Sequence, residues 1–220
     1  MIMFGISPEN AAFYGAAAAI GVPLIANFFK ELWFDWRKRR AERAFISVQL
    51  VFLLDKFVAN CANVSWDCGY DPMNPPPDET ELEDQVQIPN FDMTSVKGEY
   101  KYLKPSLLYK LHNIDIELYK ARSKLYQHQE ECYFSPDLLW EYYELRRESY
   151  ADVGLYVASI ADELRIEFGI SKTEGWDPRN SIVESMKQLR RIRANRAMGR
   201  MERKSARIMK KVKEQQGQAV

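Results

Sequence analysis

The stretch AAFYGAAAAIGVPLIANFF, from Ala11 to Phe29, contains no charged side chain. A helix of this length would measure roughly 28 Å, close to the hydrocarbon core of a bilayer, which is about 30 Å thick. Its hydrophobicity is modest, because alanine is frequent and Pro23 and Asn27 interrupt the larger apolar residues. The residues on either side therefore decide how this stretch is interpreted.

Aromatic and then basic residues follow the apolar stretch. In chain order they are Trp33, Phe34, Trp36, Arg37, Lys38, Arg39 and Arg40. Trp and Tyr gather at membrane interfaces, and Lys and Arg gather on the cytoplasmic side. Only Glu9 is charged before the stretch, a poor match to a secretory signal peptide. The pattern predicts a single-pass protein of a bacterial inner membrane, with the N-terminus outside and the C-terminal part cytoplasmic. The alternative is a buried helix of a soluble bundle.

Small residues recur four apart within the predicted span. Gly15 pairs with Ala19, and Ala17 pairs with Gly21. Such pairs let two helices approach closely in lipid, so they predict a homodimer through this face. The alternative is chance, because an alanine-rich helix generates such pairs readily.

Composition limits what the rest of the chain can be. The 220 residues carry 31 Lys and Arg and 31 Asp and Glu, so the formal net charge is zero. With residues 1–40 assigned to the membrane anchor, enough chain remains for one compact domain. The three cysteines, Cys61, Cys68 and Cys132, form no CxxC pair and are odd in number, which argues against a disulfide framework and fits a reducing cytoplasm.

The chain stays apolar after the basic residues. Val51, Leu54, Val58 and Cys61 follow helical spacing, which predicts a core helix over about 40–64 that can continue directly from the span. A second membrane crossing over 44–64 is the competing interpretation. Asp55 and Lys56 interrupt that run and argue against it.

Residues 66–104 differ in composition from the segments around them. Five prolines interrupt this segment, and eight acidic residues but no Lys or Arg lie between Trp66 and Asp92. Proline forbids continuous helix, so the segment is predicted as a long, acidic, Pro-rich loop. We expect a solvated insertion, with a functional loop as the alternative.

Two further helices are predicted from apolar stripes. The first starts near Pro105, with the stripe Leu107, Leu111, Ile114, Leu118, Ala121 and Leu125. The second starts at Ser135-Pro136 and ends at Gly169, with the stripe Leu139, Tyr143, Tyr150, Val153, Val157, Ile160 and Leu164, which Arg146 breaks once. The short break between them predicts an antiparallel pair.

A last helix is predicted to start at Asp177-Pro178. The predicted fold class is therefore all-α. It comprises a transmembrane helix (residues 1–40), a cytoplasmic bundle of three or four helices (41–180) and a basic helical tail (181–220). The apolar residues of the last helix form two short stripes that do not join into one heptad register, which argues against a long coiled coil.

The tail carries twelve Lys and Arg between Lys187 and Lys213, against the single acid Glu202. Mutual repulsion indicates an anionic partner, and anionic lipid head groups near the anchor are the first candidate. Nucleic acid is the second, with sequence-indifferent binding because interleaved aromatics are absent. Association with the acidic loop is the third, and a merely soluble extension is the plain alternative. The candidate binding residues are Arg37, Lys38, Arg39, Arg40, Arg190, Arg191, Arg193, Arg196, Arg200, Arg203, Lys204, Arg207, Lys210 and Lys211.

No motif predicts catalysis. His128, Glu131 and Cys132 could share one helix face, but a structural zinc site needs a fourth ligand. The ridge of Glu141, Glu144 and Glu148 lies beside Arg146 and Arg147, which favours a solvated charged face over acid–base chemistry. The sequence also lacks the phosphate-binding and nucleophile motifs GxxxxGK[ST], GxGxxG and GxSxG.

The predicted function is a non-catalytic interaction or scaffold protein without metal or cofactor. The first alternative is a membrane-tethered nucleic-acid binder, and the second is an enzyme with an unrecognised site. The segment Leu53–Phe57 and the later Trp176-Asp177-Pro178 resemble uncharacterised bacterial single-pass membrane proteins with a helical cytoplasmic domain. That resemblance spans residues 44–189 and implies the architecture only.

Overall fold

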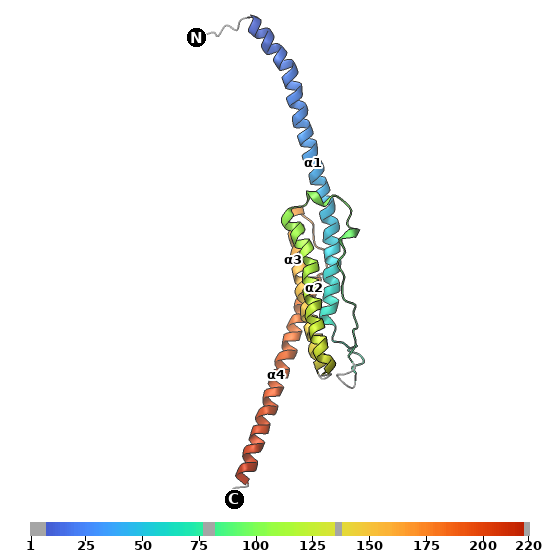
Figure 1. Cartoon of the computed structure of the whole chain (residues 1–220), viewed down its shortest axis with the longest axis vertical. Helices are drawn as coiled ribbons and strands as arrows, with labels where there is room; N and C mark the ends of the chain where they lie inside the picture. The colour runs from blue at the N-terminus through green and yellow to red at the C-terminus, as the bar shows by residue number, and fades with distance from the viewer. Residues whose placement is uncertain (1–7, 77–81, 135–137, 218–220) are drawn as a thin grey trace.

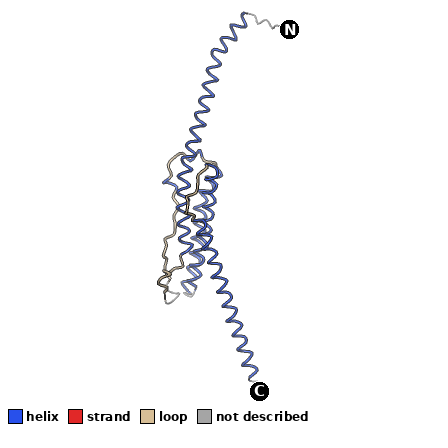
Figure 2. Tube along the Cα trace, turned by 180° about the vertical axis from the view of Figure 1, so that it is seen from behind, coloured by secondary structure: helices blue, strands red, loops and turns tan. Residues whose placement is uncertain are grey.

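A computed structural model describes residues 8–76, 82–134 and 138–217, and their side chains over 24–76, 82–131 and 138–207. The helices are α1 (Pro8–Trp66), α2 (Pro105–Phe134), α3 (Leu139–Phe168) and α4 (Pro178–Gly217), with short 3₁₀ turns η2 (Met93–Ser95) and η3 (Tyr100–Tyr102). No strand occurs in the described ranges (Figure 2). The predicted all-α class is confirmed.

Helix α1 is a single rod of 59 residues. Its N-terminal part projects from the packed helices, whereas its C-terminal part lies among them (Figure 1). The described side chains of the projecting part are exposed even where they are large and apolar, with Leu24 at 65% and Phe29 at 64%. By length and composition alone, α1 could cross a membrane; the apolar window that meets this criterion lies within Leu24–Trp66, and 50% of it is buried in the bundle.

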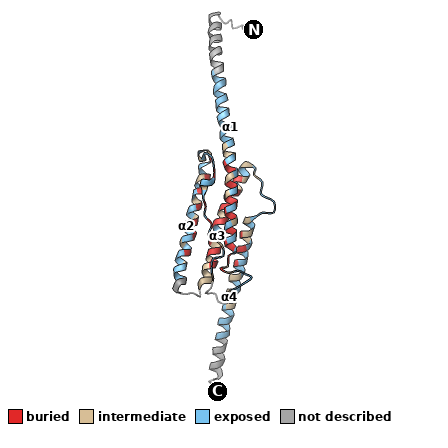
Figure 3. Ribbon diagram, turned by 90° about the vertical axis from the view of Figure 1, so that its right-hand side faces the viewer, coloured by how far each residue is buried: buried red, intermediate tan, exposed pale blue. Residues whose placement is uncertain are grey.

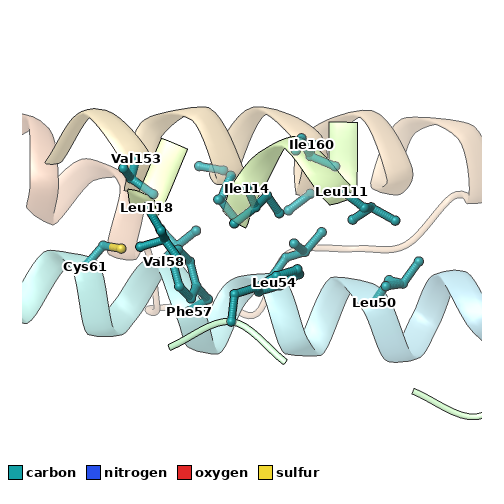
Figure 4. Packing of buried hydrophobic residues seen from close by; sticks show 14 of the residues in the cluster. Leu50, Leu54, Phe57, Val58, Cys61, Leu111, Ile114, Leu118, Val153 and Ile160 are labelled. Atoms are coloured by element: carbon teal, nitrogen blue, oxygen red, sulfur yellow. The ribbon is translucent and has the colours of Figure 1, made fainter. Parts of the chain in front are cut away.

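The C-terminal part of α1 forms the centre of the apolar core. Leu50, Leu54 and Cys61 are completely buried, and they belong to one cluster with side chains of α2 and α3 (Figure 4). Asp55, which interrupts the apolar run, is buried as well and forms an ion pair with Arg165 of α3. This part of α1 is therefore a core helix, as its 3–4 spacing predicts.

Helix α3 organises the bundle, by which we mean the packed helices between residues 44 and 196. It contacts α1, α2 and α4 and runs opposite to all three (Figure 1). Because α1 and α4 run in the same direction, the projecting part of α1 and the projecting part of α4 leave the bundle at opposite ends (Figure 3).

The local signals in the sequence place the helix ends well. Helix α2 begins at Pro105 and α4 at Pro178, where the Asp177 carboxylate accepts a hydrogen bond from the backbone N–H of Asn180 at 3.1 Å. Gly169 ends α3 in the left-handed conformation with φ 66°. Ser135-Pro136, the predicted start of α3, lies outside the described residues. The apolar stripe predicted for α2 is buried along its full length.

The segment between α1 and α2, residues 67–104, forms what we call the strap. It runs along the bundle and returns the chain to the end where α1 enters (Figures 1 and 2). Phe91, Val96 and Leu103 are buried in the core cluster. The side-chain amide of Gln49 exchanges two hydrogen bonds of 3.0 Å with the backbone of Lys97. A few apolar residues thus pack the described parts of the strap against the helices, while most of its other side chains, including Glu83 and Asp84, are exposed.

A buried ion pair ties the strap to α3. Arg146, with no exposed surface, donates to the Asp67 carboxylate at 2.5 Å and to the Val86 carbonyl. Asp67 also accepts from the backbone N–H groups of Gly69, Gln85 and Val86 at 2.9–3.1 Å. The expected solvated face around Arg146 is wrong, because the partner that neutralises this arginine lies 79 residues earlier in the chain.

Candidate functional site

The four basic residues Arg37, Lys38, Arg39 and Arg40, here called the exit cluster, all lie exposed on the projecting part of α1. The Arg37 guanidinium lies 5.4 Å from the Trp33 ring centroid, and that of Arg40 lies 5.5 Å from the ring of Trp36. Arg39 forms an ion pair with Asp35 at 2.6 Å. Indole rings with cations one turn beyond them suit the boundary between hydrocarbon and head groups.

Two of the predicted tail cations form ion pairs with α3 at the edge of the bundle. Arg193 bonds to Glu144 at 2.8 Å and to Glu148 at 2.9 Å, and Arg196 bonds to Glu144 at 2.5 Å. The hydrogen bond to Glu148 raises the pKa of Arg193 above its ordinary value. Arg196 also lies 4.1 Å from the ring centroid of Trp140. These two arginines fasten α4 to α3 rather than standing free.

The remaining described candidate binding residues of the tail are exposed: Arg190, Arg191, Arg200, Arg203, Lys204 and Arg207. The last four, here called the cationic stripe, are spaced i, i+3, i+4 and i+7 and share one face of α4. Within the described side chains none of the four forms an ion pair. The side chains of Lys210 and Lys211 lie outside the described residues.

The cationic stripe continues the face of α4 that is buried in the bundle. Ile182 and Leu189 on that face are completely buried, and Arg193 and Arg196 follow on it before the stripe begins. Met198, nine residues after Leu189, lies about 180° round the helix from it. Met198 and Met201 are accordingly 59% and 71% exposed. The two apolar stripes fail to join because one packs internally and the other faces away.

The structure does not bring the exit cluster and the cationic stripe together. Helices α1 and α4 run in parallel and meet where the Ser185 hydroxyl donates to the Ser65 hydroxyl at 2.7 Å. Counting 1.5 Å per residue along both helices, Arg200 lies roughly 60 Å from Arg40 along the long axis. The two groups of cations are therefore separate surfaces at opposite ends of the molecule (Figure 1).

The strap and the tail use different partners in the parts of the chain that the structure describes. The strap carboxylates Asp67 and Asp84 face Arg146, and the carboxylates that bind the tail arginines belong to α3. Direct association of the acidic strap with the basic tail, the third candidate from the sequence, stays a prediction.

A cavity of about 250 Å³ lies between the strap, the first turns of α3 and the point where α4 leaves the bundle. Arg147, only 3% exposed, lies in its wall. Its Nε donates to the Ser65 carbonyl at 2.8 Å, and its Nη1 lies 3.5 Å from the Cys68 sulfur. Its Nη2 has no hydrogen-bond partner among the residues that the structure describes. No local sequence pattern indicates this site, because Ser65 and Cys68 approach Arg147 from about 80 positions earlier in the chain.

Metal ligands do not converge in the described part of the chain, where no group of three or more His, Cys, Asp or Glu side chains could hold an ion. His128 contacts Glu131 at 3.3 Å, and the Cys132 side chain lies outside the described residues.

Comparisons of the whole chain with protein-family models, with curated proteins and with solved structures found no match.

Proposed function

We propose that this protein is a membrane-anchored, non-catalytic interaction protein whose bundle holds a cationic helix in the aqueous phase, far from the bilayer. The projecting part of α1 would span the membrane, and the exit cluster would lie among anionic head groups on the cytoplasmic side. The exposed apolar surface of α1 and the Trp–Arg pairs support this placement. We propose that this membrane is a bacterial inner membrane. The basic residues after the span favour an orientation with the N-terminus outside.

The distance between the cationic stripe and the bilayer limits which anionic partner the stripe can reach. If the exit cluster lies at the head groups, the stripe is roughly 60 Å away, whereas electrostatic attraction is screened over about 8 Å at physiological salt. Anionic lipid of the same membrane is then out of range, and the partner is a soluble polyanion. We infer nucleic acid, because an α-helix fits the major groove of duplex DNA and cations bind its phosphates without reading sequence. This favours the tethered nucleic-acid binder over lipid contact by the tail.

A charge-neutral variant of the stripe tests this function. The full chain in neutral-lipid nanodiscs should shift duplex DNA in a gel, and R200Q/R203Q/K204Q/R207Q should bind at least roughly 100-fold more weakly at low salt. Plotted against the logarithm of the salt concentration, the logarithm of the DNA association constant falls with a negative slope. Removing four phosphate contacts should make this slope shallower by about 3.6. The stripe lies beyond the packed part of α4, so the bundle should keep its stability.

The exit cluster supplies the matched control. R37Q/K38Q/R39Q/R40Q removes the same charge from α1 and should leave DNA affinity unchanged. Changing the nanodisc from neutral to anionic lipid should leave DNA binding by the stripe intact, because the stripe lies roughly 60 Å from that bilayer. The proposal is wrong if the two variants weaken DNA binding equally, or if anionic lipid in the nanodisc abolishes it.

We also propose a parallel homodimer. The predicted contact through Gly15, Ala19, Ala17 and Gly21 would lie in the span. A second seam supports it, because six positions of α4 are spaced 4, 3, 4, 3 and 4 apart: Ala194, Met198, Met201, Ser205, Ile208 and Val212. This is the a/d spacing of a coiled coil, and Arg196, Arg200, Arg203 and Arg207 then take outward f and c positions. Anchors in one bilayer would enforce the parallel orientation.

Cysteine cross-linking tests the seam. With Cys68 and Cys132 replaced by serine, M201C should form a disulfide-linked dimer on mild oxidation, because opposed d positions bring the thiols within bonding range. R203C, two residues along and facing outward, is the control and should stay monomeric. Native Cys61 should not interfere, because burial raises the pKa of its thiol. Equal cross-linking of both variants, or of neither, would contradict the dimer.

A further inference from the structure

We propose that the cavity beside Arg147 binds a small organic anion, with a carboxylate or phosphate group against this arginine and a flat apolar body against the aromatic wall. This site is separate from the cationic stripe and does not rest on the proposed function. Two adjacent arginines of α3, Arg146 and Arg147, are both almost completely buried, but only Arg146 has a carboxylate partner among the described residues.

Arg146 and Arg147 differ in whether a carboxylate neutralises their charge. Arg146 is completely buried and neutralised by Asp67 at 2.5 Å. Arg147 is 97% buried, since only 3% of its surface is exposed, yet no carboxylate in the described chain forms an ion pair with it. Arginine stays protonated in proteins, and a buried charge without a partner is strongly unfavourable. The Ser65 carbonyl at the end of α1 supplies only the partial charge of a helix terminus. An anion in the adjoining cavity would supply the missing partner.

The charge of the cavity wall suits an anion. Among the described residues that line the cavity, Glu144 is the only carboxylate, and it is already bound by Arg193 and Arg196. Burial raises the pKa of Tyr143, so its phenol stays neutral and adds no negative charge. Arg196 lies in the wall as a second cation, held in place by Glu144 and the ring of Trp140. The described residues of the wall therefore carry a net positive charge, and no carboxylate among them pairs with Arg147.

The size and shape of the cavity indicate the rest of the ligand. A cavity of about 150 Å³ is enough to hold benzene, so the 250 Å³ measured here has room for a ring and its anionic group. Trp140, Tyr143 and Pro76 give it flat apolar surfaces. Aromatic carboxylates and aryl phosphates are the class of ligand that matches both features.

Thermal unfolding of the full chain in detergent gives the first test. Benzoate and phenyl phosphate should each raise the melting temperature in a saturable way, and benzamide, which has the shape of benzoate without its charge, should not. The R147M variant should lose the response, while R190Q, which removes an exposed cation of α4 that does not line the cavity, should keep it. An equal response in R147M, or no response of the wild type to either anion, would overturn the proposal.

Alkylation of Cys68 gives a test that needs no variant. Cys68 is partly exposed in the cavity wall beside Arg147, so neutral iodoacetamide should reach it. Benzoate at about ten times its Kd should slow this alkylation about tenfold by occupancy. Equal concentrations of benzamide should leave the rate unchanged. If benzoate and benzamide protect Cys68 alike, the site recognises shape and not charge, and the anion proposal is wrong.

Discussion

Replacing Asp67 by alanine is expected to lower the free energy of unfolding by about 3–5 kcal/mol, because it leaves the charge of Arg146 buried without a partner. Neither side chain of this pair has exposed surface, so water cannot take the place of the lost carboxylate. The same change removes the acceptor for three backbone N–H groups of the strap. Denaturant unfolding of the full chain in detergent, followed by tryptophan fluorescence, measures the effect.

Asp84 provides the control for this prediction. It also faces Arg146, but at 3.6 Å and with 47% of its side chain exposed. D84N should therefore cost less than about 1 kcal/mol. The double variant D67L/R146M should recover part of the loss, since apolar residues often replace a buried ion pair without penalty, although the three N–H groups stay unpaired. Equal losses for D67A and D84N would contradict the structural role given to Asp67.

The second large effect is expected for Leu54 on α1. Leu54 is completely buried in the core cluster, so L54A should lower the free energy of unfolding by about 2–5 kcal/mol through lost burial and the cavity left behind. Phe52, two positions earlier on the same helix, is 67% exposed. F52A should therefore change stability by less than about 0.5 kcal/mol.

This pair of variants also separates the two interpretations of residues 44–64. A core helix of the bundle predicts a large difference between Leu54 and Phe52, because only one of them faces α2 and α3. A second membrane crossing predicts similar, small effects, because lipid would surround both side chains. The same unfolding measurement as for Asp67 decides between them.

Local signals in the sequence were enough to predict most of the helices. The spacing from Leu107 to Leu125 predicts the buried face of α2, and Asp177-Pro178 and Gly169 mark helix ends that depend only on neighbouring residues. The aromatic and basic residues 33–40 are exposed on the projecting part of α1, and their place at a membrane boundary stays a prediction.

The remaining features depend on contacts between distant parts of the chain. Arg146 and Arg147 look like surface residues by type, and only the partners at Asp67, Ser65 and Cys68 show that they are buried. The strap looks solvated by composition, because its acidic residues outnumber the few apolar ones that anchor it. From the sequence alone, Arg193 and Arg196 look the same as the exposed tail cations. Only the fold shows that Glu144 and Glu148 of α3 lie beside them.

Helix α1 continues without a break from Pro8 to Trp66, and this continuity has a mechanical consequence. No flexible joint separates the proposed span from the bundle, so the molecule would act as a lever whose pivot is the bilayer. A tilt of 20°, the average for membrane helices, would swing Arg200 sideways by roughly 20 Å, given its distance of roughly 60 Å from the pivot. Changes in bilayer thickness that alter the tilt would thereby sweep the cationic helix across a wide area of the cytoplasm.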